Sequence, residues 1–391
     1  MFYVLILLLA IVLMNYFDIR GKKKYKQFCY NLILVILILY AGLRYRIGGD
    51  TIAYLDSFYH LYPSIEEYDW KEFYIGKDPL YTLINSVVKS LGGRFYVVQI
   101  IHAAFVNILI FKYFKKHTPY IFTSVFFYLI TFYFLYNTEI LRASMSIVVA
   151  LFANDFVLER KWCKAVILYF ISCLFHAQAI VLILTPLLFC LRLNRKTIVL
   201  WCCLYYLSII VSSSMEDFLQ LVDLSEDINA KAVNYNEKGD MGTEGFTIIT
   251  YLVGVLPNFF YSLYSLYYLR KKKYSGKVMN LEPILLVGLS FIVIETVISR
   301  ANRFVDYYRI YFVLMYAELF VFLIKERIYS RRKYYQLKDV IFAPLFIILL
   351  YGLIKGEGWR YFPYSSVIEK SISDHREKER INGAAPNPNE Y

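Results

Sequence analysis

The stretch GKKKYKQFCYNLILVILILYAGLRYRIGGD (residues 21–50) shows the pattern that decides the fold. A basic run is followed by an apolar block, and the block ends in a polar segment that contains Arg44 and Arg46. Similar apolar blocks recur along the 391 residues, of which 59% are hydrophobic, whereas a soluble domain is about 45–50% apolar. Because about 17–25 apolar residues cross a bilayer as a helix, we predict an all-α, polytopic integral membrane helical bundle.

Clusters of Lys and Arg follow the ends of several apolar blocks and hold more than half of the 43 Lys and Arg residues. These clusters are Arg20–Lys26, Lys112–Lys116, Arg160–Lys164, Arg192–Lys196, Arg270–Lys277 and Lys325–Lys338. Since cytoplasmic loops of membrane proteins are enriched in Lys and Arg, we place all of them inside. The acidic segments Gly48–Lys77 and Ser214–Gly245 then lie outside. This placement explains the net charge of +12 without nucleic acid as a partner.

The alternation of basic and acidic loops predicts about ten spans, with both termini outside. The predicted spans are residues 1–17, 27–46, 95–111, 119–136, 140–158, 197–213, 246–268, 281–299, 304–324 and 339–355. Residues 78–92 are too short and too polar to cross, and Pro79 and Gly92 suit the ends of an amphipathic helix on the outer surface. Residues 1–355 form one predicted membrane domain, and residues 356–391 form a polar tail that is predicted to be disordered.

The segment between Lys164 and Arg192 breaks the simple pattern. Both residues are placed inside, yet only 27 residues separate them, and two full spans need about 40 residues. We therefore predict a short re-entrant or broken-helix hairpin with its tip at Phe175–Gln178, received by protein or by a watery cavity. The alternative is one long span at which the positive-inside rule fails.

Polar residues from distant segments fall at the predicted outer boundary of the bilayer, where the excess of Arg runs against the topology rule. Arg binds phosphate oxygens through two parallel hydrogen bonds and stays charged in a dry site. We therefore predict an anion-binding site on the outer side. The alternative is that these Arg residues only form ion pairs with neighbouring acidic residues. The candidate substrate-binding residues are Arg44, Arg46, Tyr54, Asn137, Arg142, Gln178, Arg300, Arg303 and Tyr307.

His176 is the candidate general base, because it lies at the predicted helix break and because His is the commonest base near neutral pH. Glu139 and Asp50 are the alternative catalytic residues at the same depth. A purely structural role for His176 at the break stays open. The sequence has neither a glycine-rich phosphate loop nor a His/Cys cluster, so we expect no cofactor and no required metal.

Five motifs in this order resemble the EpsG-like family of bacterial polysaccharide polymerases, which is related in function to the Wzy-type polymerases of O-antigen, capsule and exopolysaccharide. They are LRYRIGGDTIAY (43–54), DPLYTLIN (78–85), NTEILRASMSIVVALFA (137–153), FHAQAI (175–180) and RFVDYYRIYF (303–312). The family pattern has a small hydroxyl residue two positions after the His, where this chain has Gln178.

The resemblance implies a polymerase in the bacterial cytoplasmic (inner) membrane that joins oligosaccharide repeat units linked to undecaprenyl or a similar polyprenyl pyrophosphate. Its expected partners are these lipid-linked repeats, membrane lipid, a flippase and a chain-length regulator. Two other functions stay open at this point. One is another lipid-linked glycosyl transfer, such as that of an O-antigen ligase, and the other is transport of a polysaccharide or of a lipid-linked sugar, since a broken helix at membrane depth is also found in transporters.

Overall fold

The computed structural model describes residues 2–68, 78–204, 206, 256–297, 302–330, 361 and 364–368. Within these ranges every named element is a helix, and the only strand-like pairing is an isolated bridge between Arg44 and Ser366. The predicted all-α class is therefore confirmed for this part of the chain. The chain divides into two compact units, which are described separately: residues 1–183 with 316–391, and residues 184–315.

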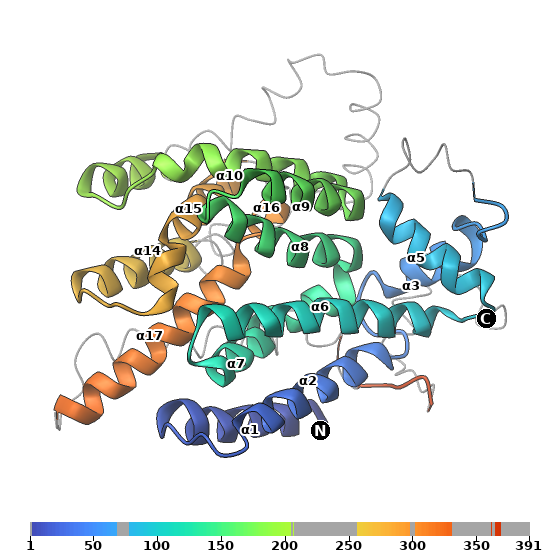
Figure 1. The fold of residues 1–391 in the computed structure, drawn as a ribbon, viewed down its shortest axis with the longest axis horizontal. Helices are drawn as coiled ribbons and strands as arrows, with labels where there is room; N and C mark the ends of the chain where they lie inside the picture. The colour runs from blue at the N-terminus through green and yellow to red at the C-terminus, as the bar shows by residue number, and fades with distance from the viewer. Residues whose placement is uncertain are drawn as a thin grey trace, which may run out of the picture. The chain divides into compact units, whose positions relative to one another are not determined.

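The first unit is built from helices (Figure 1). In chain order its elements are α1 (Phe2–Leu13), η1 (Met14–Ile19), α2 (Lys26–Gly42), α3 (Thr51–Asp56), η2 (Ser57–Leu61), α5 (Pro79–Ser90), α6 (Phe95–His117), α7 (Ile121–Thr131), η3 (Leu135–Glu139), α8 (Leu141–Leu158), α9 (Trp162–Phe175) and η4 (Ala177–Ile183). Short loops join α2 to α3, α5 to α6, α6 to α7 and α8 to α9. In this unit α8 packs against α9 and α6, α6 packs against α2, and α1 packs against α7. The shorter helix α5 packs against α6 and α9.

One end of the first unit gathers basic side chains. Lys26 at the start of α2 donates hydrogen bonds to Asp18 Oδ1 and to the carbonyl oxygen of Pro119, both over 3.1 Å. Lys116 near the end of α6 lies 2.7 Å from the carboxylate of Asp155 in the last turn of α8. These contacts bring together the end of η1, the start of α2, the start of α7 and the ends of α6 and α8. We name this side the basic end.

The opposite ends of the same helices meet at what we name the site end. There the loop after α2 bonds to Glu139, through the backbone N–H of Gly49 over 2.8 Å. The carboxylate of Asp78, just before α5, contacts Arg142 at the start of α8 and His176 just after α9. The helices α2, α6, α8 and α9 therefore each extend from one end of the unit to the other.

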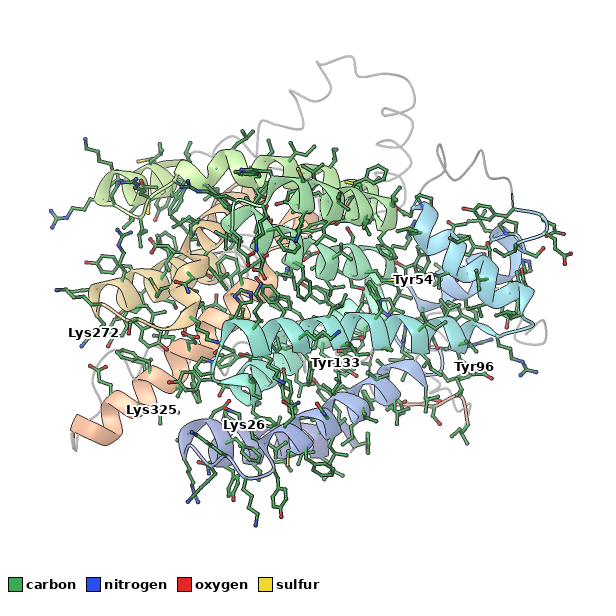
Figure 2. All side chains as sticks on the ribbon, in the orientation of Figure 1. Lys26, Tyr54, Tyr96, Tyr133, Lys272 and Lys325 are labelled. Carbon is green, nitrogen blue, oxygen red and sulfur yellow. The ribbon has the colours of Figure 1, made fainter. Side chains whose placement is uncertain are left out.

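The helices α2 and α9 run towards the site end, and α6 and α8 run towards the basic end. Figure 2 shows Lys26 and Lys325 towards the basic end, and Tyr54 and Tyr96 towards the site end. This is the arrangement expected of spans that are joined by alternating inner and outer loops. The basic end is the side that the positive-inside rule assigns to the cytoplasm, and the orientation in the membrane stays a prediction.

Buried tyrosines and one close helix contact hold the first unit together. The hydroxyl groups of Tyr3, Tyr30 and Tyr133 donate to backbone carbonyl oxygens of neighbouring helices over 2.6–2.8 Å. A buried Tyr needs such a partner for its hydroxyl group while its ring fills the core. A Cβ atom on Gly42 would lie 2.9 Å from the Cα of Ile100, so the absence of a side chain lets α2 approach α6 closely.

Three helical segments among the described residues are long and apolar enough to cross a membrane: Phe2–Ile19, Phe95–His117 and Leu141–Leu158. The apolar helices Lys26–Gly42, Ile121–Thr131, Trp162–Phe175 and Ala177–Leu187 are shorter. The structure therefore supports a membrane protein, and the count of about ten spans stays a prediction. The predicted span 339–355 and parts of spans 1–17, 197–213, 246–268 and 281–299 lie outside the described residues.

Two predicted local features are found in the first unit. The helix α5 has Pro79 in its first turn and ends before Gly92, as expected of the short amphipathic helix. The helix α9 ends at Phe175, His176 has an extended backbone with φ −158° and ψ 117°, and the 3₁₀-helix η4 follows. The helix break is therefore confirmed at its predicted place, while re-entry into the membrane stays a prediction.

The second unit contains α10 (Leu184–Leu187), η5 (Leu188–Cys190), α14 (Leu256–Lys271), η7 (Lys277–Leu281), α15 (Glu282–Val297) and α16 (Asn302–Val305). In this unit α15 packs against α14, α16, η5 and η7. The helix α17 (Arg309–Ser330) begins in the second unit and ends in the first.

A short segment beyond residue 360 pairs with the loop after α2. The backbone N–H of Tyr45 donates to the carbonyl oxygen of Ser365, and that of Val367 donates to the carbonyl oxygen of Leu43, both over 2.9 Å. Residues 364–368 are thus an ordered part of the first unit. The other residues of the predicted tail, 356–360, 362, 363 and 369–391, fall outside the described residues.

Candidate functional site

A buried carboxylate organises the site end of the first unit. Asp78 Oδ2 lies 2.7 Å from Nη1 of Arg142, and Oδ1 lies 3.1 Å from both Nδ1 of His176 and the backbone nitrogen of Ala177. The side chain of Asp78 is only 1% exposed. Burial raises the pKa of Asp78, but the hydrogen bonds and charges of His176 and Arg142, with the N–H of Ala177, outweigh it and hold the pKa below its usual value. Asp78 is therefore held as a carboxylate that joins three segments.

His176 reaches this carboxylate because the chain leaves the helical path at this residue. Its ring is 13% exposed, with Nδ1 facing Asp78 and Nε2 lying 3.1 Å from Oε1 of Gln178. The two ring nitrogens thus have different partners, one charged and one neutral. An imidazole held in this way can keep a proton on Nδ1 and use Nε2 to exchange protons with a bound molecule.

Arg142 lies at the start of α8, with its guanidinium group between acidic and aromatic partners. Its side chain is 32% exposed and bonds to Asp78. Its Cζ also lies 5.8 Å from the ring centroid of Tyr54 on α3, and the ring of Tyr54 packs edge-on against Tyr81 on α5. A cation at this distance from an aromatic ring is attracted to the ring face by a cation–π interaction. Of the predicted site residues, Arg142, His176, Gln178 and Tyr54 therefore lie close together.

The carboxylate of Glu139 contacts the loop that contains Asp50, but it bonds to the backbone of that loop and not to the side chain of Asp50. Glu139 accepts hydrogen bonds from the N–H groups of Gly49 over 2.8 Å and of Asp50 over 3.3 Å. Gly48 has a positive φ of 103°, and a Cβ atom there would lie 2.7 Å from Cβ of Thr138, so glycine is required at this turn. Glu139 thus holds the loop in place, and its role as a base stays a prediction.

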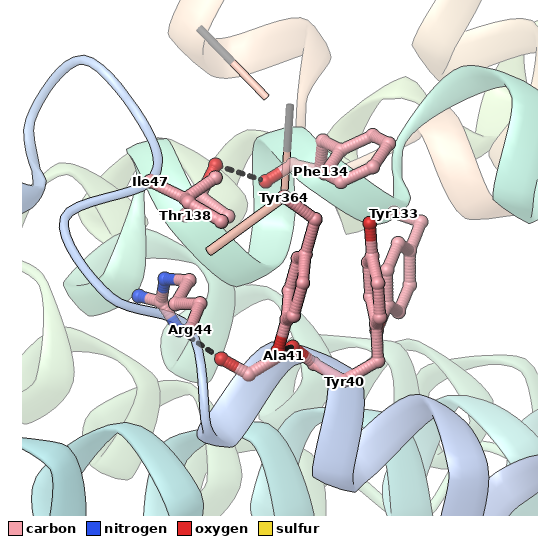
Figure 3. Close-up of a pocket in the computed structure, with 8 residues that line it drawn as sticks. All are labelled: Tyr40, Ala41, Arg44, Ile47, Tyr133, Phe134, Thr138 and Tyr364. Atoms are coloured by element: carbon pink, nitrogen blue, oxygen red, sulfur yellow. Dashed lines mark hydrogen bonds between the residues drawn. The ribbon is translucent and has the colours of Figure 1, made fainter. Parts of the chain in front are cut away.

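Arg44 lines a small pocket at the site end, formed by α2, η3 and the segment at residue 364 (Figure 3). Its side chain is fully buried, and Nη1 donates to the carbonyl oxygen of Ala41 over 2.6 Å. Within the described residues Nε and Nη2 of Arg44 have no hydrogen-bond partner. The ring of Tyr364 stacks on the ring of Tyr40, with 4.3 Å between the two ring centroids. The lining residues are Tyr40, Ala41, Arg44, Ile47, Tyr133, Phe134, Thr138 and Tyr364.

Asn137 takes part in a buried polar network inside the first unit. Its side chain donates to the hydroxyl group of Tyr128 over 3.0 Å and to the carbonyl oxygen of Tyr133 over 2.8 Å, and it accepts a bond of 2.7 Å from Asn107. Asn137 is completely buried. These contacts give Asn137 a structural role in joining α6, α7 and η3, and its contact with substrate stays a prediction.

The remaining predicted site residues are Arg46, Arg300, Arg303 and Tyr307. Arg46 has a left-handed backbone, with φ 51°, and its Cζ lies 5.4 Å from the ring of Tyr45. Arg303 is exposed and Tyr307 is buried, and both belong to the second unit. Arg300 lies outside the described residues.

Asp78 is the residue that sequence reasoning did not select, although it begins one of the quoted motifs. An Asp before a Pro at the start of a helix is typical of an N-cap. Here the side chain makes no cap hydrogen bond, and the backbone is left-handed with φ 58°. A buried carboxylate that does not cap its helix needs a hydrogen-bond or charge partner from another segment. Only the fold shows that these partners are Arg142 and His176. Among the described residues no group of three or more His, Cys, Asp or Glu is arranged to hold a metal ion.

Comparison with known protein families gives a match over most of the chain. The sequence model of the EpsG family matches residues 27–366, which is most of the chain and includes the site end of the first unit. Neither the curated proteins nor the solved structures yield a match.

Proposed function

The chain belongs to the EpsG family, and on this premise we propose that it is a membrane glycosyltransferase that polymerises a surface polysaccharide. Family membership and the apolar helices indicate a membrane protein of polysaccharide biosynthesis. The proposed donor is an oligosaccharide repeat unit linked to a polyprenyl pyrophosphate. The proposed place of reaction is the outer face of a bacterial cytoplasmic membrane, where a flippase delivers the repeat and a chain-length regulator acts on the product.

The donor brings a pyrophosphate to the depth of the lipid headgroups, and its binding requires cations at that depth. Arg142 suits this role because its guanidinium group contacts both Asp78 and the ring of Tyr54 and is still 32% exposed. Guanidinium groups bind phosphate oxygens with charge-assisted hydrogen bonds. As the bond between the anomeric carbon and the pyrophosphate breaks, the leaving oxygen takes the electron pair, and Arg142 stabilises its negative charge.

The acceptor sugar needs a base for the proton of its attacking hydroxyl group. His176 suits this role, because Asp78 holds Nδ1 and only the neutral side chain of Gln178 lies at Nε2. An acceptor hydroxyl group that replaces Gln178 at Nε2 would pass its proton to His176 as its oxygen bonds to the anomeric carbon. The pyrophosphate leaves as an anion, so no strong acid is required. The observation that carries this proposal is that a partly exposed cation and an imidazole are fixed by one carboxylate at the site end.

The proposal is tested with the purified full-length chain in lipid vesicles, supplied with a synthetic repeat unit on polyprenyl pyrophosphate. We expect glycans of more than one repeat unit, together with release of polyprenyl pyrophosphate, and we expect both to persist with a chelator present because Arg residues neutralise the leaving group. Transfer of single repeats only to added lipid or protein acceptors would instead indicate a ligase. Movement of the unchanged donor across the bilayer without a new glycosidic bond would indicate a transporter. Either result would overturn the proposal.

A further inference from the structure

The two carboxylate oxygens of Asp78 bind different partners. Oδ1 accepts from the backbone of Ala177 and faces Nδ1 of His176, both at 3.1 Å, whereas Oδ2 accepts from Nη1 of Arg142 at 2.7 Å. The two side chains belong to different segments, one at the end of α9 and one at the start of α8. One carboxylate group is rigid, so the distance and the angle between the imidazole and the guanidinium group are fixed together.

The side chain of Asp78 itself is too buried to contact a substrate. Its side chain is 1% exposed, compared with 13% for His176 and 32% for Arg142. Its left-handed backbone, with φ 58°, is a conformation that Asp tolerates better than most residues do. This conformation turns the side chain away from the first turn of α5, where it makes no cap hydrogen bond. Any effect of Asp78 on the reaction must therefore pass through the two side chains that it holds.

The contact with Asp78 also decides which nitrogen of His176 is basic. A carboxylate accepts hydrogen bonds and cannot donate them. Neutral His176 therefore carries its proton on Nδ1, and the lone pair lies on Nε2. The amide of Gln178 can turn to donate to this lone pair, and it can accept from Nε2 once the ring is doubly protonated. The imidazolium that forms during proton transfer stays next to a carboxylate, as in the Ser-His-Asp triad of proteases.

We propose that Asp78 is the positioning residue of this site, and that it holds His176 in the Nδ1–H tautomer while it anchors Arg142 at a fixed place beside it. This inference rests on the proposed function, because it concerns the base and the phosphate-binding group of that reaction. It adds a residue that neither touches the substrate nor belongs to the predicted Arg and His set.

The kinetic test uses Asp78→Asn, His176→Ala and the double variant in reconstituted protein. We expect Asp78→Asn to lower kcat by between about tenfold and 10⁴-fold, the upper value being the effect of the equivalent replacement in the protease triad. We also expect it to raise KM, because Arg142 loses its anchor. The double variant should lose less kcat than the product of the two single losses, because the part of the effect of Asp78 that passes through His176 is already lost in His176→Ala. Wild-type kcat in Asp78→Asn, or losses that multiply in the double variant, would overturn the proposal.

Asp18 provides a matched control, because it is also a buried carboxylate with several donors. It accepts from Lys26 over 3.1 Å and from the backbone and the hydroxyl group of Thr123 over 2.8 and 3.0 Å, but it lies at the basic end. If burial of a carboxylate alone mattered, Asp18→Asn would lower kcat as much as Asp78→Asn, and the proposal would be wrong. We expect Asp18→Asn to keep kcat and KM within about twofold of wild type.

A measurement that needs no activity separates this inference from the proposed function. In protein with ¹⁵N-labelled His, the shifts of the two ring nitrogens show which one carries the proton, and His176→Ala identifies the signals of His176 among the five His residues. At a pH where the ring is neutral, we expect a proton on Nδ1 in the wild type and on Nε2 in Asp78→Asn. A proton on Nε2 in the wild type would overturn the proposal. The expected shifts in a protein that makes no polymer would leave Asp78 as the positioning residue and refute the proposed function alone.

Discussion

Asp78 and His176 are 98 positions apart in the sequence, yet Oδ1 of the one lies 3.1 Å from Nδ1 of the other. The contact joins the start of a short amphipathic helix to the break of an apolar one. Through the second oxygen of Asp78 the same contact includes Arg142. Three segments thus contribute one group each, which is why an imidazole and a guanidinium group lie next to each other at the site end.

Arg142 should tolerate Lys poorly. Lys can reach a carboxylate as a point charge, but it cannot bind a phosphate through two parallel hydrogen bonds as a guanidinium group does. We expect Arg142→Ala and Arg142→Lys both to raise KM for the lipid-linked repeat by at least about tenfold, which corresponds to a loss of about 1.4 kcal/mol. The matched control is Arg94→Lys, because Arg94 is exposed near the start of α6. Full activity of Arg142→Lys would show that charge alone suffices.

Replacement of Glu139 should affect the stability of the fold more than the rate of the reaction. Its carboxylate accepts from the N–H groups of Gly49 and Asp50. An intramolecular hydrogen bond typically contributes about 0.5–1.5 kcal/mol to stability. We therefore expect Glu139→Ala to lower the free energy of unfolding by that amount. Glu139→Gln keeps one carbonyl oxygen for Gly49 and should keep kcat within about tenfold of wild type. A loss of kcat in Glu139→Gln as large as that in His176→Ala would identify Glu139 as the base instead.

The stability contributed by Asp78 should depend on pH in a defined direction. The pKa of Asp78 is lower in the folded chain than its ordinary value of 3.8, because the contributions of His176, Arg142 and Ala177 exceed the opposing effect of burial. A lowered folded pKa means that the contribution is complete above the unfolded pKa and is lost as the pH falls through the folded pKa. The difference in unfolding free energy between wild type and Asp78→Asn should therefore shrink when the pH is lowered below about 4. A difference that grows on acidification would contradict this account.

The orientation in the membrane can be tested at two exposed positions at opposite ends of the first unit. Leu91, after α5, is 81% exposed at the site end, and Tyr25, before α2, is 66% exposed at the basic end. In a background without the six natural Cys residues, a membrane-impermeant thiol reagent added to whole cells should label Leu91→Cys but not Tyr25→Cys. The converse labelling would place the basic end outside and move the site to the cytoplasm.

Local features were predictable from the sequence because they depend on short segments. The break at His176 followed from the number of residues between two basic clusters, and α5 followed from Pro79 and Gly92. The partners of Asp78 were not predictable, since they come from residues 64 and 98 positions away. The burial of Arg44 also depends on distant contacts, because residues 364–367 reach the site end only through the fold. Periodicity and composition contain no information on such pairings.

The most direct test of the central claim is the turnover of His176→Ala in purified, reconstituted protein supplied with the lipid-linked repeat. His176 faces Asp78 on one side and a replaceable neutral partner on the other, and a positioned base contributes about 10²–10⁴-fold to a rate. We predict that this variant binds the donor as wild type does, while its rate of glycosidic bond formation falls by about a hundredfold or more. A variant that elongates glycans at the wild-type rate would contradict the assignment of the base and, with it, the catalytic role of the site end.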